Sequence, residues 1–389
     1  MIAFARLRQA SLVLEKEFVP GTIPLSRFLK QWFKANKQMG SKDRKALSGL
    51  LYSYYRTVFL FRTLSMTDHL LAAQFLLPCE SFGIIEELRP QWLPYSKGSL
   101  DEKLEIIKAE FEDVNFSVET PFDRLISNQI NLPAFTQSFF TQPKLFIRIR
   151  KGCGDELKKV LTAQELHFTE LSSATLSFEN RTSLDLNTET LGGCFEVQDL
   201  SSQETANLFL PQPGSVWWDA CAGSGGKSLL LADTGEDVKI HASDYRASIL
   251  VNLRERFLQA GVAKAKVFQA DLLENINIPP DDYFDGIILD APCTGSGTWS
   301  RTPEMLSAFE PSKVESYQSR QLIMAMNALP CLKAKGALIY ITCSVFTAEN
   351  EWIVERLLQT GALKLVSQEY FKGYDRGADT LFGARFIKI

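Results

Sequence analysis

The fold is decided by a short stretch in the second half of the chain, VWWDACAGSGGKS (residues 216–228). Val216–Asp219 is an apolar run that ends in an acid, a pattern that fits a buried strand. The glycines after it let the backbone approach a ligand closely, and the helix expected next offers free N–H groups at its N-terminus. This order of strand, glycine turn and helix predicts a site for a nucleotide-like ligand.

The glycine cluster does not have the spacing of the common phosphate-binding motifs. A Walker A loop requires Gly-x4-Gly-Lys-Ser/Thr. Gly226-Lys227-Ser228 supplies the second half of that motif, but its first glycine would fall on Cys221. The Gly-x-Gly-x-x-Gly spacing of dinucleotide sites fits no better. Both motifs are therefore poor descriptions of this loop.

Strand and helix patterns alternate from about residue 190 onward. Further short apolar runs occupy residues 239–244, 266–268, 286–290 and 337–341, with helical stretches between them. Such alternation predicts an α/β fold, a Rossmann-like, doubly wound and mostly parallel sheet, over residues 191–389. Ligands of such sheets bind beyond the carboxyl ends of the strands.

Three aspartates follow the expected strands on that side. Asp244 ends the second strand, where an acid can accept hydrogen bonds from ribose hydroxyls, and Asp271 and Asp290 follow the third and fourth. A single aspartate is as often a turn or a cap, but three around one glycine loop point to a ligand. They would repel a triphosphate and suit hydroxyl, amine and sulfonium groups. We therefore expect S-adenosyl-L-methionine as the cofactor.

Two cysteines follow the fourth and fifth strands. Cys293 lies in Asp290-Ala291-Pro292-Cys293, and Cys343 in Thr342-Cys343-Ser344. A lone cysteine is usually a small buried hydrophobe, but both of these are expected on the cofactor side. Methylation of cytosine at carbon 5 needs a thiolate that adds to carbon 6, with Asp290 placed to hold the base. The residues alone do not rank the two thiols.

Composition limits the other possibilities. The three histidines have no metal-ligand spacing, so we expect neither histidine catalysis nor a metal. The seven cysteines form no CxxC pair, which favours reduced thiols in a cytoplasmic protein. We also expect no signal peptide, no membrane segment and a monomer. The net charge is −4, yet residues 1–60 carry 11 Lys and Arg against three acids, which fits either a phosphate-facing surface or a solvated helical face.

The first half of the chain is expected to form two smaller domains. Residues 1–118 have helical periodicity and are predicted to be all-α. Residues 119–190 are predicted to form a small α+β subdomain. Its first strand is expected at residues 144–150 (KLFIRIR). The alternation there predicts a half-buried strand with Arg148 and Arg150 on its open face.

Several motifs in order resemble the Nop/Sun family of RNA cytosine-5 methyltransferases. They are residues 197–203, 219–227, 290–304, 342–344 and 349–351. The resemblance implies that Cys343 is the nucleophile, that Cys293 assists breakdown of the covalent adduct, and that Asp244, Asp271 and Asp290 line the cofactor pocket. It also implies a cofactor loop made of Cys221, Ala222, Gly223, Ser224, Gly225, Gly226 and Lys227. Ser224 replaces the proline common in the family, and residues 381–389 match only loosely.

The N-terminal half has a weaker resemblance to the bacterial small-subunit rRNA methyltransferases of that family. Residues 41–56 resemble their NusB-like helical domain, and residues 146–150 the first strand of their small RNA-binding subdomain. This implies an RNA partner, 16S rRNA first and tRNA second, with Arg148, Arg150 and Arg301 as RNA contacts. The alternatives are a catalytically idle RNA-binding ribosome-assembly factor and a DNA substrate.

Overall fold

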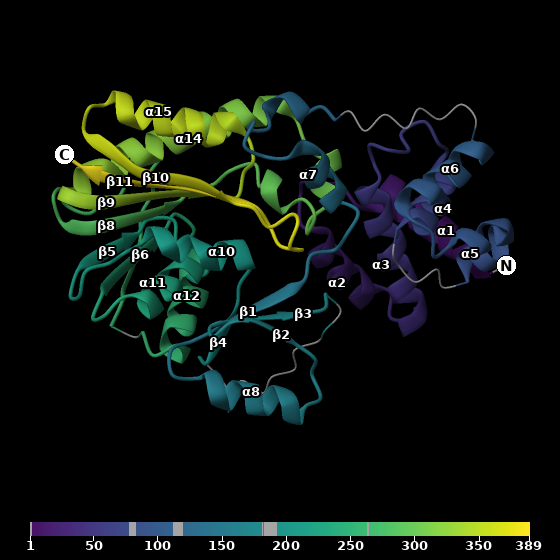
Figure 1. The fold of residues 1–389 in the computed structure, drawn as a ribbon, viewed down its shortest axis with the longest axis horizontal. Coiled ribbons are helices and arrows are strands. Elements are labelled where there is room, and N and C mark those ends of the chain that lie inside the picture. The colour runs from purple at the N-terminus through teal and green to yellow at the C-terminus, as the bar shows by residue number, and fades with distance from the viewer. Residues whose placement is uncertain (1, 78–82, 112–119, 181, 183–192, 263) are drawn as a thin grey trace. The chain divides into compact units, whose positions relative to one another are not determined.

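The computed structural model describes residues 2–77, 83–111, 120–180, 182, 193–262 and 264–389 (Figure 1). The chain forms two compact units. The helical unit consists of residues 1–124, 132–142 and 299–310, and the α/β unit of residues 125–131, 143–298 and 311–389. Each is described by itself below.

The helical unit is built on eight helices among the described residues, of which the first six share one apolar core. They are α1 (Ile2–Leu12), α2 (Leu25–Ala35), α3 (Ser41–Arg56), α4 (Met66–Leu76), α5 (Ile84–Leu88), α6 (Leu100–Glu110), α7 (Leu132–Ser138) and α13 (Glu304–Ser307). Val13–Glu17 continues α1 as a π-helix, and Pro90–Tyr95 and Asp123–Leu125 are 3-10 turns. On α3 the predicted apolar face is confirmed, because Leu47, Leu50 and Leu51 are buried in this core. The all-α character of this region therefore follows from its periodicity.

A small antiparallel sheet opens the α/β unit. Its strands are β1 (Leu145–Ile149), β2 (Thr169–Ser172), β3 (Thr175–Phe178) and β4 (Phe195–Val197), in the order β2-β3-β1-β4. Ile147 on β1 lies opposite Leu176 on β3 and Val197 on β4. The helix α8 (Gly154–Ala163) packs Leu157 and Leu161 against this sheet (Figure 1). The strand predicted here is present.

The large sheet has seven strands in the order β10-β11-β9-β8-β5-β6-β7. They are β5 (Val216–Asp219), β6 (Lys239–Asp244), β7 (Lys266–Gln269), β8 (Phe284–Asp290), β9 (Leu332–Thr342), β10 (Leu363–Phe371) and β11 (Leu381–Lys388). The five strands β5 to β9 pair in parallel, whereas β11 pairs antiparallel with both β9 and β10. The predicted parallel-dominated α/β fold is confirmed.

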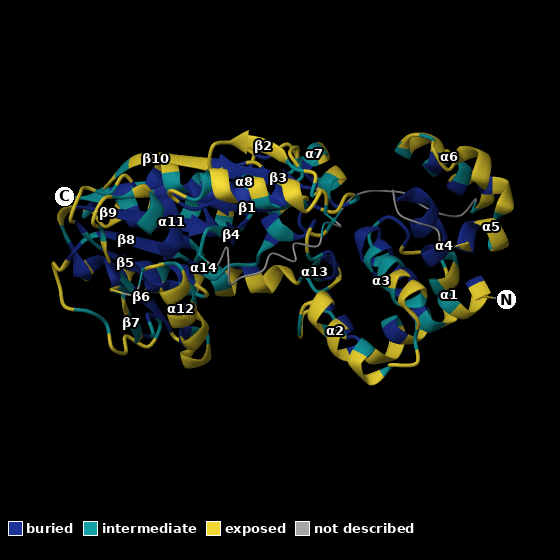
Figure 2. Ribbon diagram, turned by 90° about the horizontal axis from the view of Figure 1, so that it is seen from below, coloured by how far each residue is buried: buried dark blue, intermediate teal, exposed yellow. Residues whose placement is uncertain are grey.

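Helices cover both faces of the large sheet (Figure 1). α11 (Gly226–Thr234) and α12 (Ala247–Gln259) lie on one face, and α14 (Pro311–Ala328) and α15 (Glu351–Gln359) on the other; the short α10 (Leu200–Glu204) precedes β5. Central strands are therefore buried, as Figure 2 shows, and Ile287, Ile288 and Leu289 of β8 are fully enclosed. Burial on both faces explains why these strands are apolar runs in the sequence.

The order of the strands fixes where a ligand can bind. From β5 the chain moves outward through β6 to β7, then crosses back to β8 on the other side of β5. The direction of winding therefore reverses between β5 and β8, and ligands of such sheets bind at this switch point, beyond the carboxyl ends. Asp219 and Asp290 end these two strands.

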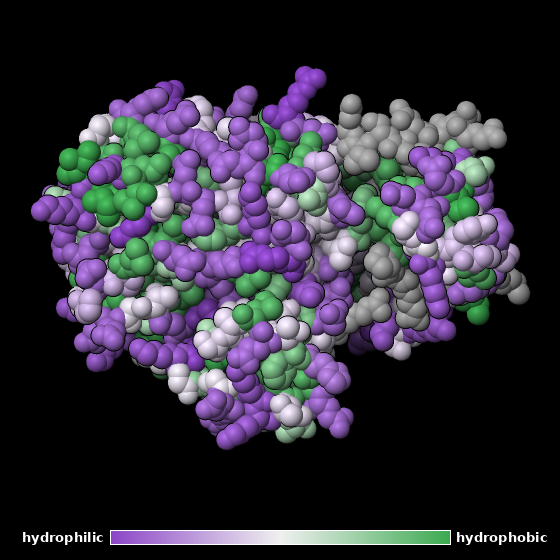
Figure 3. Space-filling view, viewed as in Figure 1, coloured by the Kyte–Doolittle hydropathy of each residue, from purple (hydrophilic) through white to green (hydrophobic). Residues whose placement is uncertain are grey.

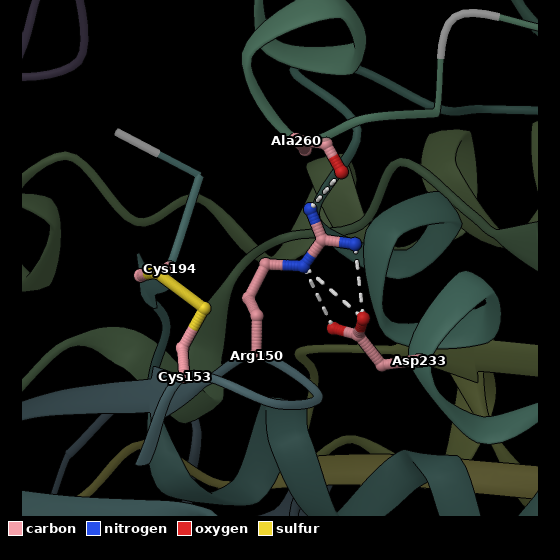
Figure 4. Close-up of a disulfide and its surroundings, with 5 residues drawn as sticks. All are labelled: Arg150, Cys153, Cys194, Asp233 and Ala260. Carbon is pink, nitrogen blue, oxygen red and sulfur yellow. Dashed lines mark hydrogen bonds and ion pairs between the residues drawn. A yellow bond between two sulfur atoms is a disulfide. The ribbon is translucent and has the colours of Figure 1, made fainter. Parts of the chain in front are cut away.

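One expectation about the cysteines is wrong. Cys153 and Cys194 form a disulfide, with their Cα atoms 5.3 Å apart (Figure 4). Cys153 lies just after β1 and Cys194 just before β4, and the antiparallel pairing of these two strands brings the residues together. The pair is separated by 41 residues, so no short sequence motif marks it.

Within the described residues, no helix has both the length and the apolar character that crossing a membrane requires.

Candidate active site and cofactor pocket

The cofactor loop leaves β5 and enters α11 through two left-handed glycines. Gly223 has a φ of 53° and Gly225 a φ of 92°. A Cβ at Gly225 would come within 2.4 Å of Leu253 Cδ1, so this position requires glycine both for its conformation and for its space. No side chain caps the start of α11, which leaves backbone N–H groups of its first turn for a ligand.

Asp244 connects the end of β6 to this loop. Its Oδ2 accepts a hydrogen bond from the backbone N–H of Gly223 at 3.1 Å, and both carboxylate oxygens accept from the Arg246 guanidinium at 3.0 Å. Burial raises the pKa of Asp244, but the hydrogen bonds from Arg246 and Gly223 outweigh it and hold the pKa below its ordinary value. Asp244 is therefore ionised and placed to accept hydrogen bonds. The Arg246 side chain that contacts it is about half exposed.

Asp271 is the third aspartate that was expected in the cofactor pocket. It lies just beyond β7, and its Oδ1 accepts hydrogen bonds from the backbone N–H groups of Leu273 and Glu274. The carboxylate therefore caps a turn. The structure does not connect Asp271 to the glycine loop.

Asp219 is a site residue that the sequence reasoning left out. It is fully buried at the end of β5; its Oδ2 accepts a hydrogen bond from Ser228 at 2.6 Å, while Oδ1 has no partner among the described residues. Burial raises the pKa of Asp219 to about 7. An orphaned acceptor at the base of the glycine loop fits a ligand that brings an amine or hydroxyl donor. Its place at a strand end is the same feature that identified Asp244.

Lys227 links the cofactor loop to the loop after β8. Its ammonium contacts Asp290 Oδ2 at 3.0 Å and Ser202 Oγ at 2.9 Å, and its side chain is nearly buried. The side chain of Asp290 is about one third exposed. One carboxylate oxygen of Asp290 is thus held by the ammonium while part of the side chain stays exposed.

The two thiols lie side by side at the carboxyl ends of β8 and β9. The Sγ atoms of Cys293 and Cys343 are 3.3 Å apart, and both residues are partly exposed. The hydrogen bond to Cys343, together with burial, raises the pKa of Cys293 well above its ordinary value, and the charge of Glu349 adds to this. The raised pKa keeps Cys293 a thiol, and at 3.3 Å this thiol can donate a hydrogen bond to the Cys343 sulfur.

The remaining residues of the predicted cofactor loop take less direct parts. Burial raises the pKa of Cys221 well above its ordinary value, which keeps it a thiol. Ser224 is exposed, and both its carbonyl and its hydroxyl accept hydrogen bonds from Arg256. These contacts hold the loop at Ser224. The C-terminal segment forms β11, paired with β9 beside Thr342.

The expectation that Arg148 and Arg150 lie on an open face is wrong. Arg148 is 4% and Arg150 8% exposed, and both form ion pairs with Asp233 on α11. Arg150 also donates to the backbone carbonyl of Ala260 at 2.8 Å (Figure 4). The open face is covered because α11 supplies an acid that neutralises both side chains. Arg301, the third expected RNA contact, is exposed and lies in the 299–310 segment of the helical unit.

A groove of about 820 Å³ lies between β1, α10 and α11 of the α/β unit. Its apolar floor includes Phe146, Leu200 and Leu230, and its rim carries Lys144 and Lys151. Neither lysine forms an ion pair within the described part of the chain, whereas the two lining acids, Glu204 and Asp233, are paired with arginines. The groove therefore has a net positive rim. On the face shown in Figure 3, hydrophobic groups break the mostly hydrophilic surface of this unit.

The helical unit also exposes basic side chains. On α2, Leu25, Leu29 and Trp32 are buried, whereas Arg27 and Lys30 are exposed on the opposite side. Further exposed lysines follow at positions 34, 37, 42 and 45. The charge of the first 60 residues is thus concentrated on a solvent-facing surface.

No group of three or more His, Cys, Asp or Glu side chains in the described ranges is placed to hold a metal ion.

Comparison with known sequences finds a family model that matches the core. Residues 206–381 match the family model described as 16S rRNA methyltransferase RsmB/F. The chain is 33% identical over 168 residues to the probable ribosomal RNA small subunit methyltransferase B of Synechocystis sp., which is 43% of this chain and 38% of that protein. It is 34% identical over 213 residues to the ribosomal RNA small subunit methyltransferase B of Xylella fastidiosa, which is 51% of this chain and 48% of that protein. The matches thus span less than half of either relative.

Solved structures show the same fold. The crystal structure of PH0851 has a TM-score of 0.67 at 18% identity, covering 98% of this chain and 97% of that one. The structure of NSun6 from Pyrococcus horikoshii with SFG has a TM-score of 0.58 at 18% identity, covering 66% and 94%. At these identities the likeness establishes the fold.

Proposed function

We propose that this chain, whose residues 206–381 carry a methyltransferase domain of the RsmB/F family, methylates carbon 5 of a cytosine in 16S rRNA. The observation that carries this proposal is the pair of thiols, Cys293 and Cys343, with Sγ atoms 3.3 Å apart at the carboxyl ends of two neighbouring strands. A binding module would need neither thiol. The relatives are described as ribosomal RNA small subunit methyltransferases, which favours rRNA over tRNA and DNA.

S-adenosyl-L-methionine is the cofactor in this proposal and supplies, when bound, a methyl group on a sulfonium. The chain offers acceptors that suit its other groups. Asp219 has a buried, unpartnered oxygen for a donor such as an amine, and Asp244 is an ionised acceptor for hydroxyls. The N–H groups at the start of α11 lie beside the same loop. We retain Asp271 only as a neighbouring pocket residue.

In the proposed reaction the Cys343 thiolate adds to carbon 6 of the cytosine, which makes carbon 5 nucleophilic. The family resemblance gives Cys343 this role, and Cys293 lies beside it with its Sγ atom 3.3 Å away. Asp290, fixed by Lys227, holds the exocyclic amine of the base. After methyl transfer a base takes the proton from carbon 5, the electron pair of that C–H bond re-forms the 5,6 double bond, and the Cys343 thiolate leaves carbon 6. Cys293 assists this breakdown in the proposal.

The RNA is held, in this proposal, by surfaces away from the thiols. The groove rimmed by Lys144 and Lys151 suits a single strand, with bases on its apolar floor and phosphates at the lysines. The basic side of α2 suits phosphates in the same way. We propose that residues 1–118 and 119–190 are RNA-binding domains and that the protein acts as a monomer in the cytoplasm, where rRNA is found.

The test is incubation with labelled S-adenosyl-L-methionine and unmodified 16S rRNA, followed by bisulfite sequencing. We expect label at one or a few cytosines, resistant to bisulfite conversion. Label on tRNA alone would show that the substrate is tRNA. RNA binding without any label would show that the protein is a catalytically idle assembly factor.

A further inference from the structure

Behind the thiol pair lies a carboxylate that takes no part in the reaction described above. Glu349 ends the 3-10 turn Thr347–Glu349, directly before α15, and is fully buried. No lysine or arginine forms an ion pair with it in the described part of the chain. Its carboxylate instead accepts four hydrogen bonds. A buried carboxylate held in this way is an organiser of neighbouring backbone rather than a surface charge.

Two of the residues that donate to Glu349 are the immediate neighbours of the thiols. Thr294, next to Cys293, donates from its backbone N–H to Oε1 at 2.9 Å and from its hydroxyl to Oε2 at 2.6 Å. Ser344, next to Cys343, donates from its hydroxyl to Oε2 at 2.5 Å. The fourth donor, the side-chain amide of Gln321 on α14, approaches Oε1 at 3.1 Å. One carboxylate thus holds the loops after β8 and β9 together.

We propose that Glu349 is a positioning residue that keeps the Sγ atoms of Cys293 and Cys343 within hydrogen-bond distance by clamping the residue that follows each of them. The inference rests on the proposed function for its effect on catalysis, but not for its effect on the thiols. A side chain displaced by about 1 Å can cost roughly 100-fold in rate. Loss of the clamp should therefore affect chemistry more than RNA binding.

The chemistry of the four donors separates a clamp from a charge effect. In Glu349→Gln the amide oxygen can still accept from the Thr294 N–H and from Gln321. The new NH₂ group then faces the hydroxyls of Thr294 and Ser344, and hydroxyls can rotate to accept. The clamp survives without its charge. In Glu349→Asp the charge survives, but the shorter side chain cannot reach both loops. A clamp therefore predicts that Gln is tolerated better than Asp, and a charge effect predicts the reverse.

The first experiment measures thiol proximity in the full chain without RNA or cofactor. Diamide takes the two thiol hydrogens onto its azo nitrogens while a Cys293–Cys343 disulfide forms, and peptide mapping follows the product. We expect the unmodified protein and Glu349→Gln to form this bond at rates within about twofold. Glu349→Asp and Glu349→Ala should be slower, on the order of tenfold or more. Glu355→Gln, an exposed site on α15, is the matched control.

The second experiment measures methyl transfer with the same variants. We expect Glu349→Asp to lower kcat by roughly 100-fold with KM for RNA within about twofold, and Glu349→Gln to stay within about fivefold of the unmodified protein. Should Asp equal or surpass Gln in either experiment, or should all variants oxidise at one rate, the clamp is wrong. If no protein methylates RNA while the order of oxidation rates holds, the proposed function fails and the clamp stands.

Discussion

Polar side chains lie in apolar surroundings at two places, the carboxyl edge of the large sheet and the first strand of the small sheet. At the first place they stay partly exposed, and at the second they are buried. At the large sheet, Cys293, Cys343 and Asp290 remain partly exposed. On β1, Arg148 and Arg150 are buried and neutralised by Asp233. A strand pattern alone therefore does not tell a reactive edge from a structural ion pair. The deciding factor is whether another element brings a partner of opposite charge.

The largest effect should come from the thiols. Cys343→Ala should abolish both methylation and any covalent protein–RNA complex, because the group that adds to carbon 6 is gone. Cys293→Ala should instead let the complex accumulate as a slow-migrating band in a denaturing gel. If the two phenotypes were exchanged, the assignment of nucleophile and helper would have to be exchanged as well.

The next effect concerns Asp219 and pH. Its carboxyl has an ordinary pKa of 3.8 and a pKa of about 7 in the fold, because burial disfavours the charged form. Between those pH values the folded protein keeps a proton that the unfolded chain has released, so the free energy of unfolding should fall by about 4 kcal/mol as pH rises from 4 to 7.

Replacement of Asp219 by Asn should remove that part of the pH dependence, since the amide cannot ionise and can still pair with Ser228. Denaturant unfolding of both proteins at pH 5 and pH 8 measures the difference. If the free energy of unfolding changed between pH 5 and pH 8 by the same amount in both proteins, Asp219 would not be the group that holds the proton.

A smaller effect is expected on β1. Arg150→Met should lower the free energy of unfolding by about 3 kcal/mol, because Asp233 loses one of its two buried partners. Lys158→Met, which breaks an exposed ion pair with Glu170 in the same small sheet region, should cost less than about 1 kcal/mol. Chemical denaturation of both variants makes the comparison. Equal costs would mean that the Arg150 pair is no more important than a surface pair.

The smallest effect should come from the groove. A double variant, Lys144→Ala with Lys151→Ala, should weaken RNA binding and lower the salt dependence of the binding constant by roughly one unit of slope per lysine. Stability should change by less than about 0.5 kcal/mol, because both side chains are exposed. Lys364→Ala on β10 is the control. If the unmodified protein, the double variant and Lys364→Ala bound RNA with the same affinity, the groove would not be an RNA contact.

The parts of the fold that could be predicted are those with local or periodic causes. Strands β5 to β9 are recognisable because a buried parallel strand is an apolar run, and Gly225 because its backbone and its space both demand glycine. β10 is not, since most of its residues are exposed and give no alternation. The family resemblance implied the roles of the two thiols. The contacts of Glu349 could not be predicted, because Thr294 and Gln321, which donate to it, lie far from it in the chain.

The failures share one physical cause. Asp233 lies more than 80 residues from Arg148 and Arg150, and Cys194 lies 41 residues from Cys153. Whether a charged or sulfur-bearing side chain is satisfied depends on such distant partners, and no spacing rule describes them.

The most direct test of the central claim is to trap the adduct on RNA that carries 5-fluorocytosine, because the fluorine on carbon 5 cannot leave as a proton does. Peptide mapping of the trapped complex then identifies the attached cysteine. The account predicts a single modified peptide that contains Cys343. Attachment at Cys293 or Cys221, or no covalent complex with a substrate that the protein methylates, would contradict it.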